Sequence, residues 1–155
     1  VRTGGAVRYS RTALSSDPVL VMNGDTWMET DLAAFVRAHV QSDCDVSMMC
    51  VLVDDVSRYG NVAIEDDRVV EFIEKDPAKK QPGYINGGVY LFSQRALRKL
   101  CAMRAFSLEQ DFFNRLDSGT IHAFIPETAS FIDIGTPDSL ADANSILPGQ
   151  KEIDG

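Results

Sequence analysis

The stretch Val19-Leu-Val-Met-Asn-Gly-Asp25 constrains the fold of this chain more than any other feature. Asn-Gly after an apolar run is the strongest short signal for a tight β-hairpin, which would make Asp25 a turn residue. A strand that ends in Gly-Asp can instead present the carboxylate to a ligand at the edge of a sheet. Because residues 26–40 read as a helix, no second strand follows for a hairpin. We therefore expect residues 18–22 to form a strand buried on both faces, with Asp25 at the ligand edge.

Apolar segments alternate with helical patterns along the rest of the chain. This alternation favours an α/β fold with a largely parallel sheet. Further strands are expected at residues 45–53, 61–64, 69–73, 87–92, 121–125 and 131–134. The pair 61–64 and 69–73 is separated by a short acidic stretch and is predicted to be a hairpin. Residues 75–83 are polar and contain proline, which is typical of a loop.

Helix starts are marked by side chains that can cap them. Thr30 is expected to cap a helix that begins at Asp31 and carries a stripe of apolar residues. Ser93 opens a basic helix, and the Ser107-Leu-Glu-Gln110 run fits a capping box. Thr136-Pro137 predicts the start of a last helix, because Pro is favoured at the first helical position. A short helix is also plausible over residues 6–14.

The bulk composition excludes several classes of protein. A formal net charge of -8 argues against a broad nucleic-acid-binding surface, which needs clustered Lys and Arg. The three cysteines have neither the spacing of a zinc site nor that of a disulfide framework, which is typical of a reducing cytosol. No apolar run is long enough to cross a bilayer, and no signal peptide is recognised. We expect a cytoplasmic protein without nucleic-acid or membrane partners.

Polar side chains follow three of the predicted strands. Asp25, Glu74-Lys75 and Asp133 come at or just after strand ends, where open α/β sheets bind their ligands. Asp25 and Asp133 together could hold one Mg2+, which prefers one or two carboxylates with waters and phosphate oxygens. Glu74 could accept hydrogen bonds from ligand hydroxyls, and Lys75 could meet a phosphate as a point charge. Asn86 offers both a donor and an acceptor to a sugar-like ligand.

Each of these residues also has a purely structural interpretation. Asp133 could be a loop carboxylate, Glu74-Lys75 the solvated end of a hairpin strand, and Asn86 a turn residue. The pair Gly4-Gly5 suits either a tight turn or a backbone that approaches a ligand closely.

Seven short runs, taken in order, resemble one known family. They are Thr3-Gly-Gly-Ala6, Val21-Met-Asn-Gly-Asp25, Arg58-Tyr-Gly60, Phe72-Ile-Glu-Lys75, Ile85-Asn-Gly-Gly-Val-Tyr90, Phe106-Ser-Leu-Glu109 and Phe131-Ile-Asp-Ile-Gly-Thr136. The chain is similar to the sugar nucleotidyltransferases, also called nucleotide-diphosphate-sugar pyrophosphorylases. Within them it resembles the branch of D-glycero-D-manno-heptose 1-phosphate and mannose-1-phosphate guanylyltransferases.

The resemblance implies a Rossmann-like three-layer α/β/α sandwich with a mixed, mainly parallel sheet. It implies Mg2+-dependent nucleotidyl transfer from a nucleoside triphosphate, GTP by branch, to a heptose or mannose type sugar 1-phosphate. The products would be pyrophosphate and a sugar nucleotide for cell-surface polysaccharides. It assigns the nucleotide base to Thr3, Gly4 and Gly5, the sugar to Gly60, Glu74 and Asn86, the sugar phosphate to Lys75, and Mg2+ to Asp25 and Asp133.

Two departures from the family pattern shape our expectations. Arg2 stands where the family usually has glycine, and the family's opening strand and Gly-rich triphosphate loop have no counterpart. We expect residues 1–148 to be the C-terminal two thirds of one nucleotidyltransferase domain, followed by a tail at 149–155. We also expect this chain alone to have little transferase activity. Strand 19–22 should have an exposed edge that can associate with another chain, so a homo-oligomer is possible.

Two other functions compete with the transferase. The first is a non-catalytic module of the same fold that binds sugar phosphates or regulates a partner. The second is a metal-dependent glycosyltransferase, which would need an Asp-x-Asp pair at the strand end. Asn23-Gly-Asp25 is followed by Thr-Trp instead.

Overall fold

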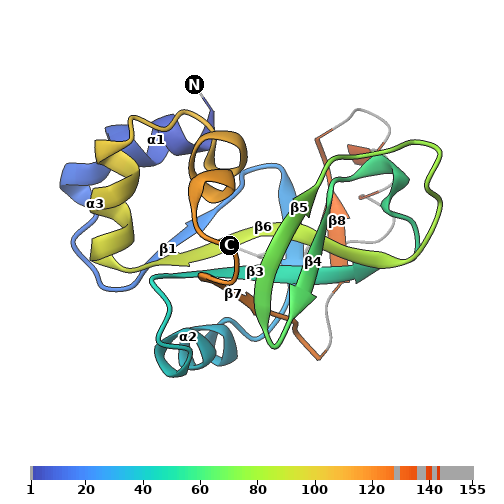
Figure 1. Cartoon of the computed structure of the whole chain (residues 1–155), viewed down its shortest axis with the longest axis horizontal. Helices are drawn as coiled ribbons and strands as arrows, with labels where there is room; N and C mark the ends of the chain where they lie inside the picture. Colours follow the sequence, from blue (N-terminus) through green and yellow to red (C-terminus); the bar gives the residue numbers. More distant parts are fainter. Residues whose placement is uncertain (1, 128–129, 136–138, 141–142, 144–155) are drawn as a thin grey trace, which may run out of the picture.

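The computed structural model describes residues 2–127, 130–135, 139–140 and 143, and contains two β-sheets with helices around them (Figure 1). The main sheet has the strand order β1 (Val19–Met22), β6 (Gly83–Phe92), β3 (Val46–Val53), β7 (Ile121–Phe124), β5 (Arg68–Ile73) and β4 (Asn61–Glu65). The second sheet pairs β2 (Thr26–Glu29) with β8 (Ser130–Asp133). The helices include α1 (Thr3–Tyr9), α2 (Leu32–Gln41) and α3 (Gln94–Ala102).

Helices cover both faces of the β1–β6–β3–β7 part of the main sheet. On one face, α1 and α3 pack over a core that contains Val7, Leu97, Met48, Tyr90 and Phe92. On the other, Phe35 of α2 packs with Met49, Val89 and Leu91. Neighbouring residues of β3 and β6 serve opposite cores because strand side chains alternate between faces. Both strands therefore read as continuous apolar runs in the sequence.

The prediction of a mainly parallel sheet is wrong. Only β3 and β7 pair in parallel, whereas every other described pairing is antiparallel. The long strand β6 lies between β1 and β3 and is antiparallel to both. β4 and β5 form the predicted hairpin, whose turn places Asp66 and Asp67 at φ of 47° and 59°, the geometry of a tight hairpin turn. The hairpin needs only a two-residue turn, because antiparallel neighbours can be joined without the long crossover that parallel neighbours need.

β1 is correctly predicted as a strand, but not as one buried on both faces. It forms one edge of the main sheet, as expected, and Leu20 and Met22 remain 42% and 50% exposed. These side chains lie on the same face as Leu91 and Val89, their cross-strand partners. That face is covered by α2 over β6 and β3 and is left open at β1.

The prediction of a helix over residues 26–40 is also wrong in its first half. Thr26–Glu29 forms β2, and α2 begins at Leu32 with Asp31 rather than Thr30 as its N-cap. Asp31 Oδ1 accepts a hydrogen bond 2.9 Å long from the Ala34 amide, which satisfies one free N–H of the first turn. A strand therefore does follow Asp25, but its partner is β8 and not β1, so no hairpin forms at Asn23-Gly24.

Other predicted helix starts are confirmed. Ser93 caps α3, and Ser107 Oγ accepts from the Gln110 amide at the start of η3 (Leu108–Phe112), a π-helical turn followed by the 3-10 turn η4 (Phe113–Arg115). The helix predicted over residues 6–14 exists but starts earlier, as α1 followed by η1 (Arg11–Ala13). The start predicted at Thr136-Pro137 and the tail lie outside the described residues. None of the described helices is long and apolar enough to cross a membrane.

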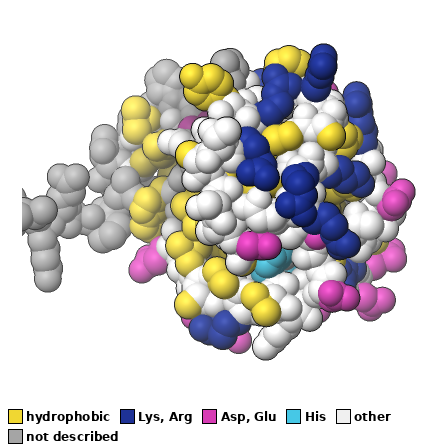
Figure 2. All heavy atoms as spheres, turned by 90° about the vertical axis from the view of Figure 1, so that its left-hand side faces the viewer, with side chains coloured by type: hydrophobic (Ala, Val, Ile, Leu, Met, Phe, Trp, Pro, Cys, Tyr) yellow, Lys and Arg dark blue, Asp and Glu magenta, His cyan; other side chains and the backbone are white. Residues whose placement is uncertain are grey.

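Charge is unevenly distributed over the molecule. Residues 1–16 and 94–108, which include α1 and α3, contain seven of the 15 Lys and Arg and no Asp or Glu. The other 124 residues hold eight Lys and Arg against 23 Asp and Glu, a formal charge of -15. Figure 2 shows Lys and Arg gathered on the face that contains α1 and α3. The net charge of -8 therefore combines one basic face with an acidic remainder.

Two histidines share one serine hydroxyl under α2. Ser47 is fully buried on β3, and its Oγ lies 2.7 Å from His39 Nδ1 and 3.2 Å from His122 Nδ1. The hydroxyl hydrogen can serve only one ring, so the other ring must donate its own N–H. Burial lowers the pKa of both imidazoles. At His39, the carboxylates of Asp17 and Asp45 partly offset this lowering. At His122, Arg68 lowers the pKa further, and Asp67 partly offsets it.

We expect acid to destabilise the fold through this pair. Because the folded pKa of each ring lies below the ordinary value of 6.5, the unfolded chain binds more protons once the pH falls through 6.5. Stability should be complete above pH 7 and should fall between pH 6.5 and 5.5, as measured by the urea midpoint. The double variant His39→Gln/His122→Gln should lose most of this dependence of the urea midpoint on pH. A wild-type urea midpoint that stays flat from pH 7.5 to 5.5 would contradict the account.

Candidate functional site

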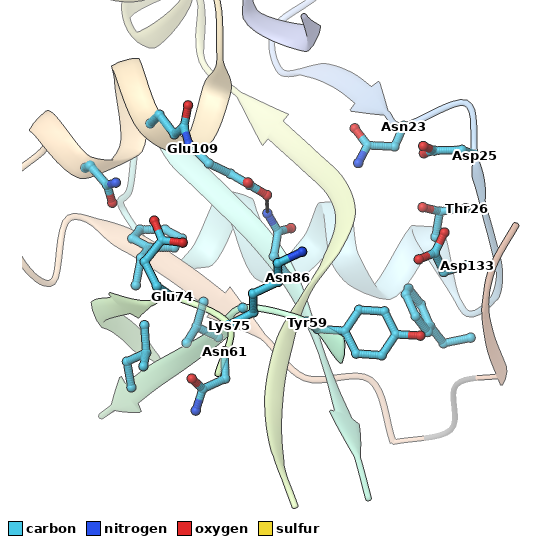
Figure 3. Close-up of a pocket in the computed structure, with 17 residues that line it drawn as sticks. Asn23, Asp25, Thr26, Tyr59, Asn61, Glu74, Lys75, Asn86, Glu109 and Asp133 are labelled. Atoms are coloured by element: carbon cyan, nitrogen blue, oxygen red, sulfur yellow. Dashed lines mark hydrogen bonds between the residues drawn. The ribbon is translucent and has the colours of Figure 1, made fainter. Parts of the chain in front are cut away.

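A cavity of about 380 Å3 opens between the two sheets and contains six of the residues singled out in the sequence (Figure 3). They are Asp25, Gly60, Glu74, Lys75, Asn86 and Asp133. They come from five segments of the chain, and the fold brings them to one place. The cavity walls also contain the aromatic rings of Tyr59, Phe72 and Phe131. A polar pocket with aromatic walls of this size suits a small polar ligand.

One wall is built where β1 ends and β2 pairs with β8. Thr26 lies directly opposite Asp133 in that pairing, and the Ile134 amide donates a 2.9 Å hydrogen bond to the Asp25 carbonyl oxygen. The two carboxylates converge beside Gly135. A Cβ placed on Gly135 would lie 3.0 Å from Asp133 Oδ1 and 3.5 Å from Asp25 Oδ2.

This pair fits a hard divalent cation. Among the residues that the structure describes, no three His, Cys, Asp or Glu side chains gather into a metal site. Mg2+ does not need such a cage, because it binds through one or two carboxylates and completes its shell with waters and phosphate oxygens. Asp25 and Asp133 supply two oxygen donors beside a pocket large enough for the rest of that shell. The donor set therefore matches Mg2+ better than a softer metal.

The opposite wall is built by the β4–β5 hairpin. Glu74 and Lys75 follow β5 directly, and Gly60 precedes β4. A Cβ on Gly60 would lie 3.1 Å from the Ile73 carbonyl oxygen and 3.9 Å from the Lys75 amide nitrogen, so glycine permits the two segments to pass closely. Gly60 thus has a structural role in this wall, because it lets the chain before β4 lie against the end of β5.

Asn86 lies on β6 between the two walls, and both N–H donors and the carbonyl oxygen of its side chain have protein partners. Nδ2 donates to Glu109 Oε1 at 2.7 Å and to the Tyr90 hydroxyl at 2.8 Å, while Oδ1 accepts from the Gly88 amide at 3.0 Å. Figure 3 shows Asn86 and Glu109 joined in this way at the pocket. Burial, and then the nearby Glu109 carboxylate, raise the pKa of Tyr90 far above its usual range. Tyr90 is therefore a neutral phenol.

Thr3, Gly4 and Gly5 do not line this cavity. They form the first turn of α1, where Gly5 N donates to the Phe106 carbonyl oxygen at 2.9 Å. A Cβ on Gly4 would lie 3.0 Å from that same oxygen, so this glycine pair permits a close approach to the backbone of its own chain. Arg2, just before this turn, links it to the cavity, because its Nη1 donates to Gln110 Oε1 at 2.6 Å.

Several lining residues were given no role by the sequence analysis. They are Asn23, Thr26, Tyr59, Asn61, Glu109, Gln110 and Asn114. Glu109 and Gln110 belong to the capping run after Ser107, which overlaps one of the seven family-like runs but was assigned no ligand contact. Asn23 belongs to the Asn-Gly-Asp run singled out in the sequence, but the local sequence does not show that Asn23 lies beside Gly88 of β6. Lys75 is the only Lys or Arg among the described lining residues, against four carboxylates.

The chain is similar to known proteins over nearly its whole length. Residues 2–149 match the family model described as Nucleotidyl transferase. The chain is 33% identical over 152 residues to a D-glycero-alpha-D-manno-heptose 1-phosphate guanylyltransferase of Aneurinibacillus thermoaerophilus, covering 97% of this chain and 62% of that protein. It is 31% identical over 151 residues to a mannose-1-phosphate guanylyltransferase of Mycobacterium tuberculosis, covering 94% and 41%.

Solved structures show the same likeness. HddC from Yersinia pseudotuberculosis superposes with a TM-score of 0.81 at 33% identity, over 95% of this chain and 63% of that one. A second structure of HddC, complexed with GMP-PN, gives a TM-score of 0.80 over the same shares of the two chains. The chain thus spans less than two thirds of the length of these relatives.

Gly88 should be the most sensitive glycine of the site. It has φ of +73°, and a Cβ there would lie 2.8 Å from the Asn23 side chain, whereas Gly24 has open space around it. We expect Gly88→Ala to lower the free energy of unfolding by about 1–3 kcal/mol, because a left-handed backbone strains any L side chain. Gly24→Ala should be close to neutral in the same urea titration. Equal midpoints for the two variants would contradict the described packing of β6 against Asn23.

Proposed function

The chain belongs to the nucleotidyl transferase family, and from that premise we propose that its pocket binds a sugar 1-phosphate of the mannose or heptose type. The proposed reaction transfers a guanylyl group from GTP to that phosphate. The proposal draws the base and the sugar from the names of the relatives, which are heptose and mannose 1-phosphate guanylyltransferases. Thr3, Gly4 and Gly5 remain the proposed contacts of the base.

The observation that carries this proposal is the opposition of two kinds of wall. The Asp25 and Asp133 carboxylates converge on one side, and Glu74 with Lys75 lies on the other. A sugar 1-phosphate has matching halves, because its hydroxyls suit a carboxylate acceptor and its phosphate suits a cation. A pocket whose two walls did not differ in this way would fit a neutral sugar or a free phosphate equally well.

In the proposed reaction, Lys75 would hold the sugar phosphate and Glu74 would accept hydrogen bonds from sugar hydroxyls. An oxygen of the sugar phosphate attacks the α-phosphorus of the triphosphate in line, and the bond from that phosphorus to the bridging oxygen breaks. Pyrophosphate leaves with the electron pair of that bond, and no proton transfer is required for the step. Mg2+ held by Asp25 and Asp133 would neutralise charge on the phosphates. The protein contributes chiefly position and electrostatics.

A non-catalytic module that binds sugar phosphates is the second candidate. The observation in its favour is the single Lys75 among four carboxylates in the described lining, since a triphosphate carries more charge than one ammonium offsets. The two candidates share the sugar-phosphate site and differ in whether pyrophosphate is released.

A thermal-shift panel tests the shared part of the proposal. Mannose 1-phosphate, in the presence of Mg2+, should raise the melting temperature of the chain, because a ligand of the native state stabilises it by mass action. GTP should raise it more than UTP, CTP or dTTP. Pyrophosphate release from GTP plus mannose 1-phosphate, measured on this chain fused to the opening strand and Gly-rich loop of a relative, should separate transferase from binding module. If no sugar phosphate and no nucleotide shifts the melting temperature at millimolar concentration, the proposed function is wrong.

Gly135→Ala tests the proposed metal wall without removing a carboxylate. The added methyl would lie 3.0 Å from Asp133 Oδ1 and 3.5 Å from Asp25 Oδ2, in the space that a cation between them needs. We expect the Mg2+-dependent part of the thermal shift to be lost, with the ligand-free melting temperature changed by no more than about 2 °C. Gly24→Ala, one residue from Asp25 and in open space, is the matched control and should keep the full Mg2+ response. If the Gly135→Ala variant also keeps the full Mg2+ response, Asp25 and Asp133 are not the metal site.

A further inference from the structure

We propose that Asn86 is a positioning residue, and that it fixes Glu109 as a second hydroxyl acceptor in the sugar subsite. With Glu74, the subsite then has two carboxylates and selects neutral, polyhydroxylated sugars over sugars with an acidic group. This inference rests on the proposed function and deepens it. It also replaces the direct sugar contact that the resemblance assigns to Asn86.

The hydrogen-bonding capacity of Asn86 leads to this role. A primary amide has two N–H donors and one carbonyl acceptor. Both donors are used, toward Glu109 at 2.7 Å and the Tyr90 hydroxyl at 2.8 Å, and the carbonyl oxygen accepts from Gly88 at 3.0 Å. A ligand could take a donor from Asn86 only by breaking one of these bonds. Both donors of the side chain are thus committed to protein partners, and only the second lone pair of the carbonyl oxygen is left.

The partners of Asn86 are themselves rigid. Tyr90 is 1% exposed, and Gly88 is buried with its backbone held at φ of +73°. The register of β3 against β6 shifts here: Met48 pairs with Tyr90 and Cys50 with Asn86, so β6 has two extra residues at this point. Such a bulge re-aims the side chain beside it. Gly87 permits it, since a Cβ there would lie 2.7 Å from Met28 and 3.0 Å from the Met49 carbonyl oxygen.

Glu109 differs from Asn86 in having capacity left over. Its Oε1 accepts from Asn86, and no further partner is recorded for this carboxylate among the described residues. It is exposed at the cavity and lies on η3, whose first turn is capped by Ser107. Glu109 can therefore accept from a ligand hydroxyl while Asn86 fixes its direction. A hydrogen bond to a charged group is stronger than a neutral one, so the fixed carboxylate matters for binding.

A double-mutant cycle on the dissociation constant of mannose 1-phosphate tests the positioning role. In calorimetry with Mg2+, Asn86→Ala and Glu109→Ala should each weaken binding by about tenfold, the value of one charge-assisted hydrogen bond. Because Asn86 acts through Glu109, the double variant should be no more than about twofold weaker than Glu109→Ala. Effects that multiply in the double variant would mean that Asn86 contacts the sugar itself, and would overturn the proposal.

Asn114→Ala is the matched control for the cycle. Asn114 is an exposed asparagine that lines the same cavity without a recorded link to Glu109, so its effect should multiply with that of Glu109→Ala. If the wild-type chain does not bind mannose 1-phosphate at all, it is the proposed function that fails. Binding with multiplying effects for Asn86 and Glu109 overturns this inference alone.

A measurement without ligand covers the case in which Asn86→Ala does not fold. Glu109 is exposed, so Glu109→Ala should fold, and the side-chain amide signals of Asn86 in a 1H–15N NMR spectrum should move. Unchanged Asn86 amide signals would show that Asn86 and Glu109 are not hydrogen-bonded in solution, and would overturn the proposal.

Mannuronic acid 1-phosphate tests the predicted class of sugar. It differs from mannose 1-phosphate by one carboxylate, which the carboxylates of Glu74 and Glu109 should repel. We expect the wild-type chain to bind it at least about tenfold more weakly, and Glu109→Gln to narrow that difference. Equal affinity of the wild-type chain for the two sugars would contradict the two-carboxylate subsite.

Discussion

The pairing of β2 with β8 is the interaction on which the site depends. It joins residues near the first strand to residues more than a hundred positions later, and its register sets Thr26 opposite Asp133. The carboxylates of Asp25 and Asp133 then meet beside Gly135, where no side chain separates them. Loss of this small sheet would leave the main sheet and the core beneath α1 and α3 in place, but Met28 of β2 would no longer pack on the Phe35 and Val51 clusters. It would remove one of the two walls of the cavity.

The proposed sugar subsite between the walls depends on a single irregularity in a buried strand. β6 lies between β1 and β3, and its Gly87-Gly88 bulge gives it two residues more than β3 has opposite it. The bulge turns Asn86 toward Glu109 and holds Gly88 against Asn23. A regular strand would be easier to form, but Asn86 and Glu109 would not meet. The same short segment thus connects the wall of the proposed metal site, through Asn23, with the proposed sugar subsite.

How far the sequence predicts this structure differs from element to element. Signals within about ten residues were right in part: the caps Ser93 and Ser107 and the β4–β5 hairpin are confirmed, whereas the cap at Thr30 is wrong. Pairings between distant segments were not readable, because β2 has its partner at β8 and β6 inserts antiparallel between β1 and β3. Six of the nine candidate residues share the cavity, since strand-end placement and family order pointed to the same positions. Glu109 was missed because its importance lies in one bond from Asn86.

The central claim is that these two walls form one site for a sugar 1-phosphate. It is tested most directly by adding mannose 1-phosphate with Mg2+ to the 15N-labelled chain and mapping the backbone amides that shift. The account predicts joint shifts at Gly135 on one wall and at Gly60, Lys75 and Glu109 on the other, with a common dissociation constant. The amides of α3 on the basic face should stay in place. Shifts confined to the basic face, or to one wall alone, would contradict the account.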